Sequence, residues 1–234
     1  MTYKGLLIGL SRSLSIICAI ACLFSALKTT PLTTVLGGYF TAPVFSLIIS
    51  RTILKEKVGT TGYVAIGLGI AGTFMVLQPD TDFGPGSALS LLAGLFFSFY
   101  LITSSLGEGH ISPTASTLVS LAFGTLLLFP LSFHDIPDMI QFSPKTISLL
   151  VAMGALTAIC HFLVLSALTQ GPVSSLSTLA YLELVSVVLL DYFCFDDPLE
   201  PLEMFGIILI AMAGILSSNS TSRKTHCLEE EGFA

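Results

Sequence analysis

The chain has 234 residues, of which 53% are apolar and only 10% are charged, with a net charge of −6 and a mean hydropathy of +0.90. Soluble domains carry about 25% charged residues, so this composition excludes a disordered chain and a disulfide scaffold and almost excludes a soluble globule. The negative charge gives no support for nucleic-acid binding. The composition therefore predicts an all-α polytopic membrane protein.

Apolar stretches recur along the chain at the length that a membrane span requires. A bilayer core of about 30 Å needs roughly 20 apolar residues in a helix. The sequence has eight such stretches, at residues 5–27, 31–50, 58–78, 86–106, 114–133, 146–168, 172–192 and 203–219. We predict eight transmembrane helices, followed by a polar, disordered tail over 220–234.

Lysine and arginine are unevenly distributed between the segments on the two sides of the membrane that connect or flank the predicted spans. If the N-terminus is cytoplasmic, six fall on the cytoplasmic side (Lys4, Arg51, Lys55, Lys57, Arg223 and Lys224) and two outside (Lys28 and Lys145). Positive residues are enriched in short cytoplasmic loops. We therefore expect a protein of the cytoplasmic (inner) membrane with both termini in the cytoplasm.

The chain contains an internal repeat. Residues 23–31 and 164–172 share Ser, Ala, Leu and Pro at an offset of 141 residues, and the basic joint at 51–57 corresponds to an acidic joint at 192–198. We assign three spans to a first copy, at 1–80, and five to a second, at 84–219. A five-span unit has odd parity, so consecutive copies lie inverted in the membrane, as is typical of secondary transporters.

Three segments together resemble a known family. The stretch Tyr39-Phe40-Thr41-Ala42-Pro43-Val44-Phe45, the turn Leu54-Lys55-Glu56-Lys57 and the glycine-rich span ending Gly69-Ile70-Ala71-Gly72 resemble the EamA-type repeat of the drug/metabolite transporter superfamily. The resemblance covers residues 5–219. It implies ten spans in two five-span halves. We read this chain as lacking the first two, either because it begins at an internal Met or because the protein is naturally shortened.

Three ionisable residues, Arg12, His161 and Glu183, fall inside predicted spans. A charge at bilayer depth costs roughly 2.5–3.5 kcal/mol on insertion scales, so such residues normally face the protein interior. At 1.5 Å per helical residue, Arg12 and His161 lie about 10 Å and Glu183 about 16 Å from the same end. We predict that Glu183 faces a cavity, in reach of Arg12 directly or through water or substrate. A structural ion pair is the alternative, and for His161 a hydrogen bond within the core.

The family resemblance enlarges this candidate site. It implies that the spans 31–50 and 172–192 line a central cavity, which adds Tyr39 and Tyr181 to the substrate-binding set of Glu183, Arg12 and His161. It also implies that Pro43 faces or shapes this cavity. A proline within a helix kinks it, which suits a gating role, and a purely structural proline is the alternative. The glycines of Gly67-x-Gly69-x-x-Gly72 match a dinucleotide fingerprint by letter. Inside a span, however, they favour close helix packing.

These features favour secondary transport of a small polar metabolite. Arg12 and Glu183 together suit a zwitterion, which indicates an amino acid or a derivative. The resemblance adds that some relatives exchange S-adenosylmethionine for S-adenosylhomocysteine. We expect no cofactor, no metal and no ATP coupling, because the chain has no G-x-x-x-x-G-K-[ST] motif.

The expected partners are a small-molecule substrate and the lipid bilayer, without nucleic acid, and a homodimer stays open. Two alternatives to transport remain: a non-transporting truncated chain or assembly partner, and a membrane-embedded enzyme. A prenyl transferase would need two acidic clusters within the membrane, whereas Asp196 and Asp197 form a single pair in a loop. We therefore do not expect an enzyme.

Overall fold

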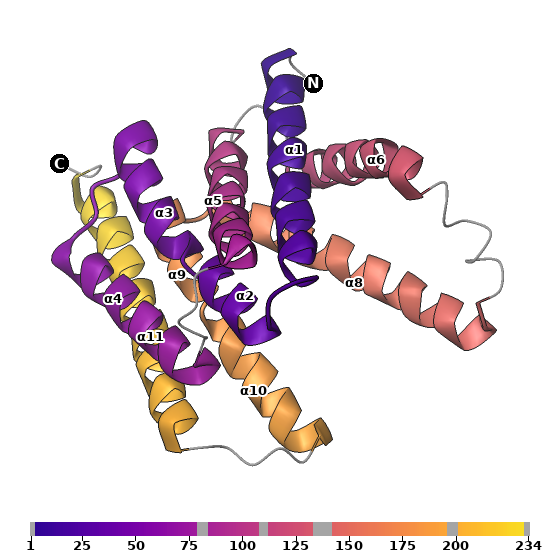
Figure 1. The fold of residues 1–234 in the computed structure, drawn as a ribbon. Coiled ribbons are helices and arrows are strands. Elements are labelled where there is room, and N and C mark those ends of the chain that lie inside the picture. Colours follow the sequence, from indigo (N-terminus) through magenta and orange to yellow (C-terminus); the bar gives the residue numbers. More distant parts are fainter. Residues whose placement is uncertain (1–2, 79–83, 108–111, 133–141, 196–200, 232–234) are drawn as a thin grey trace.

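The computed structural model describes residues 3–78, 84–107, 112–132, 142–195 and 201–231, and within these ranges the chain is helical without strands. The helices, shown in Figure 1, are α1 (Tyr3–Ala26), α2 (Leu32–Tyr39), α3 (Ala42–Ile49), the π-helix η1 (Ser50–Leu54), α4 (Thr60–Leu77), α5 (Pro85–Leu106), α6 (Pro113–Ser132), α8 (Pro144–Leu168), α9 (Val173–Leu179), α10 (Leu182–Phe195) and α11 (Pro201–Glu231).

The predicted spans correspond to these helices. Six runs are long and apolar enough to cross a membrane: Gly5–Ala26, Leu32–Leu54, Thr60–Leu77, Pro85–Leu106, Pro113–Pro130 and Pro144–Leu168. The seventh predicted span is the pair α9 and α10, and the eighth is the shorter apolar part of α11, Pro201–Ser217. The prediction of an all-α polytopic membrane protein is therefore confirmed.

Helix α11 extends beyond the span predicted for it. A disordered tail was expected from residue 220, but the helix continues to Glu231. No proline or glycine occurs between Gly214 and Gly232, so the sequence has no residue that ends a helix in this interval. The prediction of disorder there is wrong up to Glu231.

Glycines allow α4 and α11 to lie side by side (Figure 1). A Cβ added at Gly72 would lie 2.6 Å from the carbonyl oxygen of Gly206, and a Cβ at Gly206 would lie 2.7 Å from that of Gly72. A Cβ added at Gly69 would lie 2.3 Å from the ring of Tyr181, whereas a Cβ added at Gly67 would have no neighbour within 4 Å. The predicted packing role is confirmed for Gly69 and Gly72 and wrong for Gly67.

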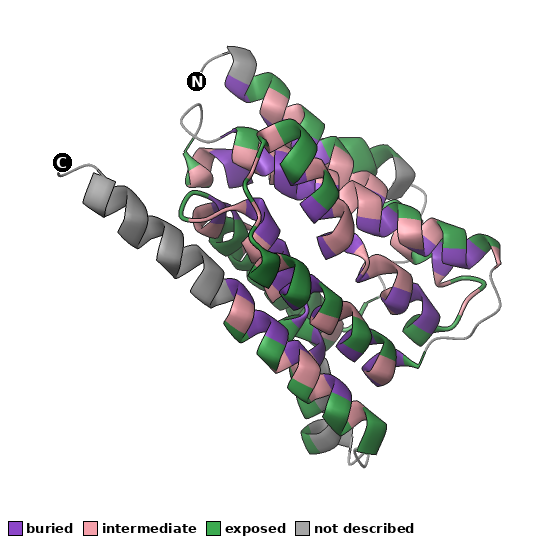
Figure 2. Ribbon diagram, turned by 90° about the vertical axis from the view of Figure 1, so that its left-hand side faces the viewer, coloured by how far each residue is buried: buried purple, intermediate pink, exposed green. Residues whose placement is uncertain are grey.

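The two repeat-related helices α1 and α8 differ in burial. Helix α1 packs along α5 and against α6, and it buries six residues there. Their counterparts at the offset of 141 are all uncovered or only half-buried: 146, 150, 153, 154, 160 and 167. None of the residues 144–164 of α8 is buried. In Figure 2, buried residues lie mainly where helices face one another. The face that α1 buries is therefore open on α8.

Two spans are broken at related positions. The first breaks at Phe40 and Thr41, between α2 and α3, and the second at Ala180 and Tyr181, between α9 and α10. A kink was predicted from Pro43, which lies in the first turn of α3. However, the second break has Leu184 at the position equivalent to Pro43. Proline therefore is not what the two breaks have in common.

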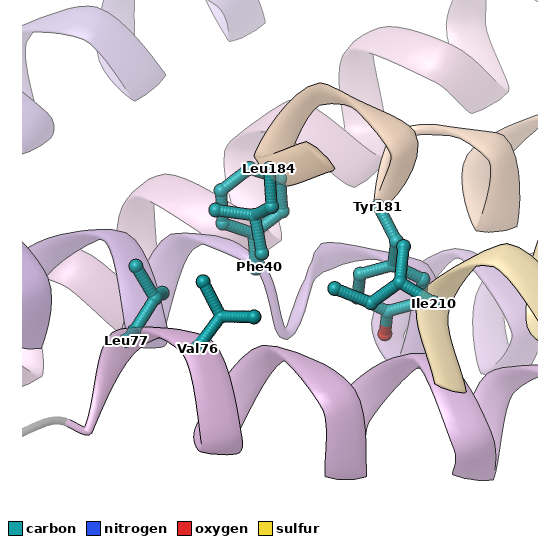
Figure 3. Packing of buried hydrophobic residues seen from close by; sticks show 6 residues of the cluster. All are labelled: Phe40, Val76, Leu77, Tyr181, Leu184 and Ile210. Carbon is teal, nitrogen blue, oxygen red and sulfur yellow. The ribbon is translucent and has the colours of Figure 1, made fainter. Parts of the chain in front are cut away.

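The breaks meet in the core of the bundle. Phe40 and Tyr181, which are separated by 141 residues, have ring centroids 6.4 Å apart. Around them, residues from four helical segments form the cluster in Figure 3: Phe40, Val76, Leu77, Tyr181, Leu184 and Ile210. Contact between residues that the repeat relates is expected where they lie close to an axis that relates the two copies.

Candidate functional site

A cavity of about 390 Å³ lies between α5, α8, α9 and the first turn of α10. Its volume falls in the range of about 300–1,000 Å³ that small-molecule sites occupy. The apolar part of the wall consists of Phe97, Leu101, Leu163, Val164, Ala167, Leu168, Leu176, Leu179 and Ala180. Its polar part, within the described chain, consists of Ser177 and Glu183. The cavity is thus an apolar space with one ionisable side chain.

Glu183 reaches this wall because the span is broken just before it. The break at Ala180 and Tyr181 starts a new helix inside the apolar stretch, and Glu183 lies in the first turn of α10. The unpaired N–H groups of a helix N-terminus favour a negative charge, by about 0.3–1 kcal/mol at exposed sites. Glu183 is solvent-accessible from the cavity side and forms no salt bridge with Arg12 in the described structure.

Arg12 donates its hydrogen bonds to α6 rather than to Glu183. Its side chain is completely buried. Its Nε donates to Ser120 Oγ at 3.0 Å, and its two Nη atoms donate to Ser116 Oγ, Ser120 Oγ and the carbonyl oxygen of Ser116. No ion pair joins Arg12 to Glu183 in the described structure, and a link between them through water or substrate stays a prediction. The guanidinium joins α1 to α6 through neutral acceptors, and Arg12 does not line the cavity.

A chain of aromatic rings connects several predicted site residues. Neighbouring ring centroids lie 5.3–6.4 Å apart, within the usual range for aromatic contacts. In order, the rings are Tyr181, Phe40, Tyr39, Phe97, Tyr100 and His161. The Tyr100 hydroxyl and His161 Nδ1 are also hydrogen-bonded at 3.0 Å. His161 therefore has the core hydrogen bond that was the alternative to a substrate contact.

The predicted residues thus lie at different distances from the cavity. Glu183 is on its wall, and Tyr39 contacts the wall through Phe97. Tyr181 is completely buried in the cluster of Figure 3, and its hydroxyl has no hydrogen-bond partner in the described structure. Pro43 is buried in α3.

Sequence reasoning missed the residues that hold Arg12 and the aromatic side of the cavity. Ser116 and Ser120 are four residues apart, so they share one face of the predicted span 114–133. That spacing was a readable signal for a polar partner. Phe97 lies in a run of aromatic residues, Phe96-Phe97-Ser98-Phe99-Tyr100. Nothing in such a run distinguishes the ring that faces a cavity from those that face lipid.

The fold matches a known crystal structure. One solved structure has a TM-score of 0.70 and 16% sequence identity, covering 93% of this chain and 89% of that chain. At this identity the match shows the fold alone.

The curated relatives are transporters. The S-adenosylmethionine uptake transporter of Rickettsia conorii is 23% identical over 187 residues, 79% of this chain and 62% of that protein. That of Rickettsia bellii is 25% identical, covering 80% of this chain and 64% of the relative. A riboflavin transporter of Vibrio cholerae is 30% identical over 130 residues, 54% of this chain and 42% of that protein. The chain thus spans less than two thirds of these relatives' length.

The family assignment covers both copies of the repeat. The sequence pattern of the EamA-like transporter family matches residues 3–78 and 84–219. These ranges include every predicted span, and the transporter relatives point to transport rather than catalysis. The chain is a multi-pass membrane protein that belongs to the EamA-like transporter family.

Proposed function

We propose that this protein is a secondary transporter for a small metabolite that carries a positive charge, an amino acid or a derivative of one, across the cytoplasmic membrane. The observation that carries the proposal is Glu183, the one charged side chain on the wall of the described cavity. A carboxylate in an apolar space is stabilised by a cation in contact with it. A substrate with a positive group supplies that cation when it binds.

S-adenosylmethionine is the first substrate to test. It combines a sulfonium and an ammonium group with an aromatic base, which would match the Glu183 carboxylate and the Phe97 ring. The Rickettsia relatives named as S-adenosylmethionine uptake transporters support this choice. Arg12 is not the partner that we propose for the substrate carboxylate, because Ser116 and Ser120 already accept its hydrogen bonds.

Riboflavin is the second candidate, and the apolar walls favour it. It is a neutral molecule with a large aromatic ring system, and a Vibrio cholerae relative is named as its transporter. The two candidates differ in their need for a negative charge. Transport of a cation should depend on Glu183, whereas transport of a neutral ring should depend mainly on the apolar wall.

The test is uptake by the purified chain in liposomes, with labelled S-adenosylmethionine, riboflavin and a panel of amino acids. For a cationic substrate, we expect Glu183→Gln to reconstitute normally and to lower uptake about tenfold or more, since hydrogen bonds to charged groups are among the strong ones. Glu203→Gln, the same substitution in the first turn of α11, is the control. Normal uptake by the Glu183→Gln variant would contradict the proposed role.

The same experiment addresses the assembly-partner alternative, which the open face of α8 favours. Uptake by the purified chain alone would show that no second protein is needed. A folded chain that transports none of the tested compounds would favour a role that depends on a partner, including a second copy of the chain.

A further inference from the structure

Glu56 makes a contact between the two copies of the repeat. Its carboxylate accepts two backbone hydrogen bonds from the start of α9, one from Val173 N to Oε1 at 2.9 Å and one from Ser174 N to Oε2 at 3.2 Å. The partners are 117 and 118 residues apart in the sequence. Glu56 thus links the joint that precedes α4 to the joint between α8 and α9.

The Glu56 carboxylate accepts hydrogen bonds from backbone N–H groups that have no acceptor within α9. The first N–H groups of a helix lack intrahelical acceptors, and Pro172 at the N-cap of α9 provides no side-chain acceptor. Val173 is completely buried and Ser174 is nearly so. The backbone before Glu56 turns through Lys55, which has a left-handed conformation with φ of 55°. That turn directs the carboxylate toward α9.

The contact fixes the helix that forms one wall of the cavity. Leu176, Ser177 and Leu179 of α9 line it, and the chain continues through the break to Glu183. Holding the first turn of α9 against the opposite repeat therefore sets the position of this wall. It also keeps the two repeats together at the end of the bundle where α9 begins.

We propose that Glu56 is a latch that closes this end of the bundle and must release the α9 amides when the cavity opens toward it. The proposal rests on the proposed transport function, because a transporter has to expose its site to each side in turn. A carboxylate that accepts two N–H bonds suits the role. The bonds are charge-assisted and strong, yet they break without covalent change. The loop charges predict that this end is cytoplasmic.

The test measures the accessibility of the cavity and requires no substrate. Ala180→Cys is introduced on the cavity wall of a chain whose five native cysteines are replaced by serine or alanine. A membrane-impermeant maleimide then labels it in vesicles of defined, opposite orientations. We expect Glu56→Ala to raise labelling from the Glu56 side at least tenfold, because it removes two charge-assisted hydrogen bonds and the loss of each one shifts an equilibrium by about tenfold. Labelling from the other side should not rise.

A second variant removes the latch from the opposite partner. Val173→Pro deletes the N–H that binds Oε1, and proline fits here because it occupies the first helical position and follows an extended residue, Pro172 with ψ of 145°. We expect a smaller rise in labelling than in Glu56→Ala, because the Ser174 hydrogen bond remains. Combining Val173→Pro with Glu56→Ala should give no further rise beyond that of Glu56→Ala alone. Lys55→Gln, an exposed neighbour of Glu56, is the control and should leave labelling unchanged.

The outcomes separate a latch from a purely structural contact. Unchanged labelling in both variants, or an equal rise from the two sides, would overturn the proposal, since the second result means general loosening. If Glu56→Ala does not accumulate in the membrane, Glu56→Gln gives the same measurement, because the amide keeps one acceptor and loses the other. Failure of the uptake assay would leave these results intact, so the latch and the substrate are tested separately.

Discussion

At the scale of single residues, the buried Arg12 shows how a charge can be held in an apolar bundle without an acid. Three donor atoms of its guanidinium bind two serines on α6, so the hydrogen-bonding capacity is largely used although no carboxylate of the described residues pairs with it. Arginine suits this arrangement because its planar group presents several donors in fixed directions. Arg12 therefore acts in this conformation as a clamp between α1 and α6.

Ser120→Ala should weaken this clamp. The substitution removes the acceptor of two of the four hydrogen bonds that Arg12 donates to α6 and leaves the charge buried. We expect the midpoint of thermal unfolding in detergent, followed by size-exclusion chromatography, to fall by several degrees. Ser15→Ala is the control, since the Ser15 hydroxyl binds only the Ser11 carbonyl of its own exposed helix face. Equal midpoints for the two variants would contradict the clamp.

The sequence determines how deep a residue lies along a membrane span, but it does not determine toward which neighbour its side chain points. Counting residues along the predicted spans predicts a place inside the bilayer region for Arg12, His161 and Glu183, and all three lie in helices. The count does not give the rotation of each helix about its axis. That rotation decides that Arg12 meets Ser116 and that Glu183 meets the cavity. It depends on packing among several helices, which a single sequence does not show.

At the scale of helices, close glycine contacts and helix breaks determine how the bundle is built. Gly94 on α5 approaches the break between α2 and α3, where an added Cβ would lie 2.8 Å from the carbonyl oxygen of Tyr39. Ser98, one turn further, donates to the carbonyl oxygen of Ala42 at 2.8 Å. Helix α5 thus packs against the backbone carbonyl groups on both sides of the break between α2 and α3. The sequence predicted the spans and, through Pro43, a kink near the first break, but the second break has Leu184 at the equivalent position and no proline to indicate it.

Gly206→Ala should separate α11 from α4. The new Cβ would lie 2.7 Å from the Gly72 carbonyl oxygen, and backbone cannot move away as a flexible side chain could. Overpacking of this kind costs about 1–3 kcal/mol, so we expect a clearly lower thermal midpoint. Gly67→Ala has open space and should leave the midpoint unchanged or slightly higher, because alanine favours helix. Equal thermal midpoints for Gly206→Ala and Gly67→Ala would contradict the proposed close contact at Gly206.

At the scale of the whole molecule, the two copies of the repeat are related but unequally covered. The element order α1, broken span, α4 matches α8, broken span, α11, and the equivalent residues Phe40 and Tyr181 are in contact. We predict that the two sets superpose by a rotation about an axis in the membrane plane. Composition and the repeat were sufficient to predict the fold class. The open face of α8 could not be read from them, since its residues are as apolar as buried ones.

The charge asymmetry predicts opposite sides for the two joints of the repeat. A reporter fused after Lys57 should be cytoplasmic, and one fused at Asp197, which lies outside the described residues, should be external. The reason is that basic residues in short loops are retained in the cytoplasm. Paired fusions to alkaline phosphatase and green fluorescent protein measure this. The same compartment for both fusions would overturn the inverted arrangement of the repeat.

The ring chain also has an optical consequence for the molecule as a whole. The protein has 17 Phe and 6 Tyr but no Trp, so it shows no tryptophan fluorescence until a tryptophan is introduced by mutation. Phe97 is on the cavity wall, and its ring lies 5.3 Å from Tyr39 and 5.8 Å from Tyr100. A Phe97→Trp variant would carry a single indole there, with tyrosines near enough to transfer excitation energy to it. Titration with substrate should change its emission, while Phe24→Trp on the exposed side of α1 should stay constant.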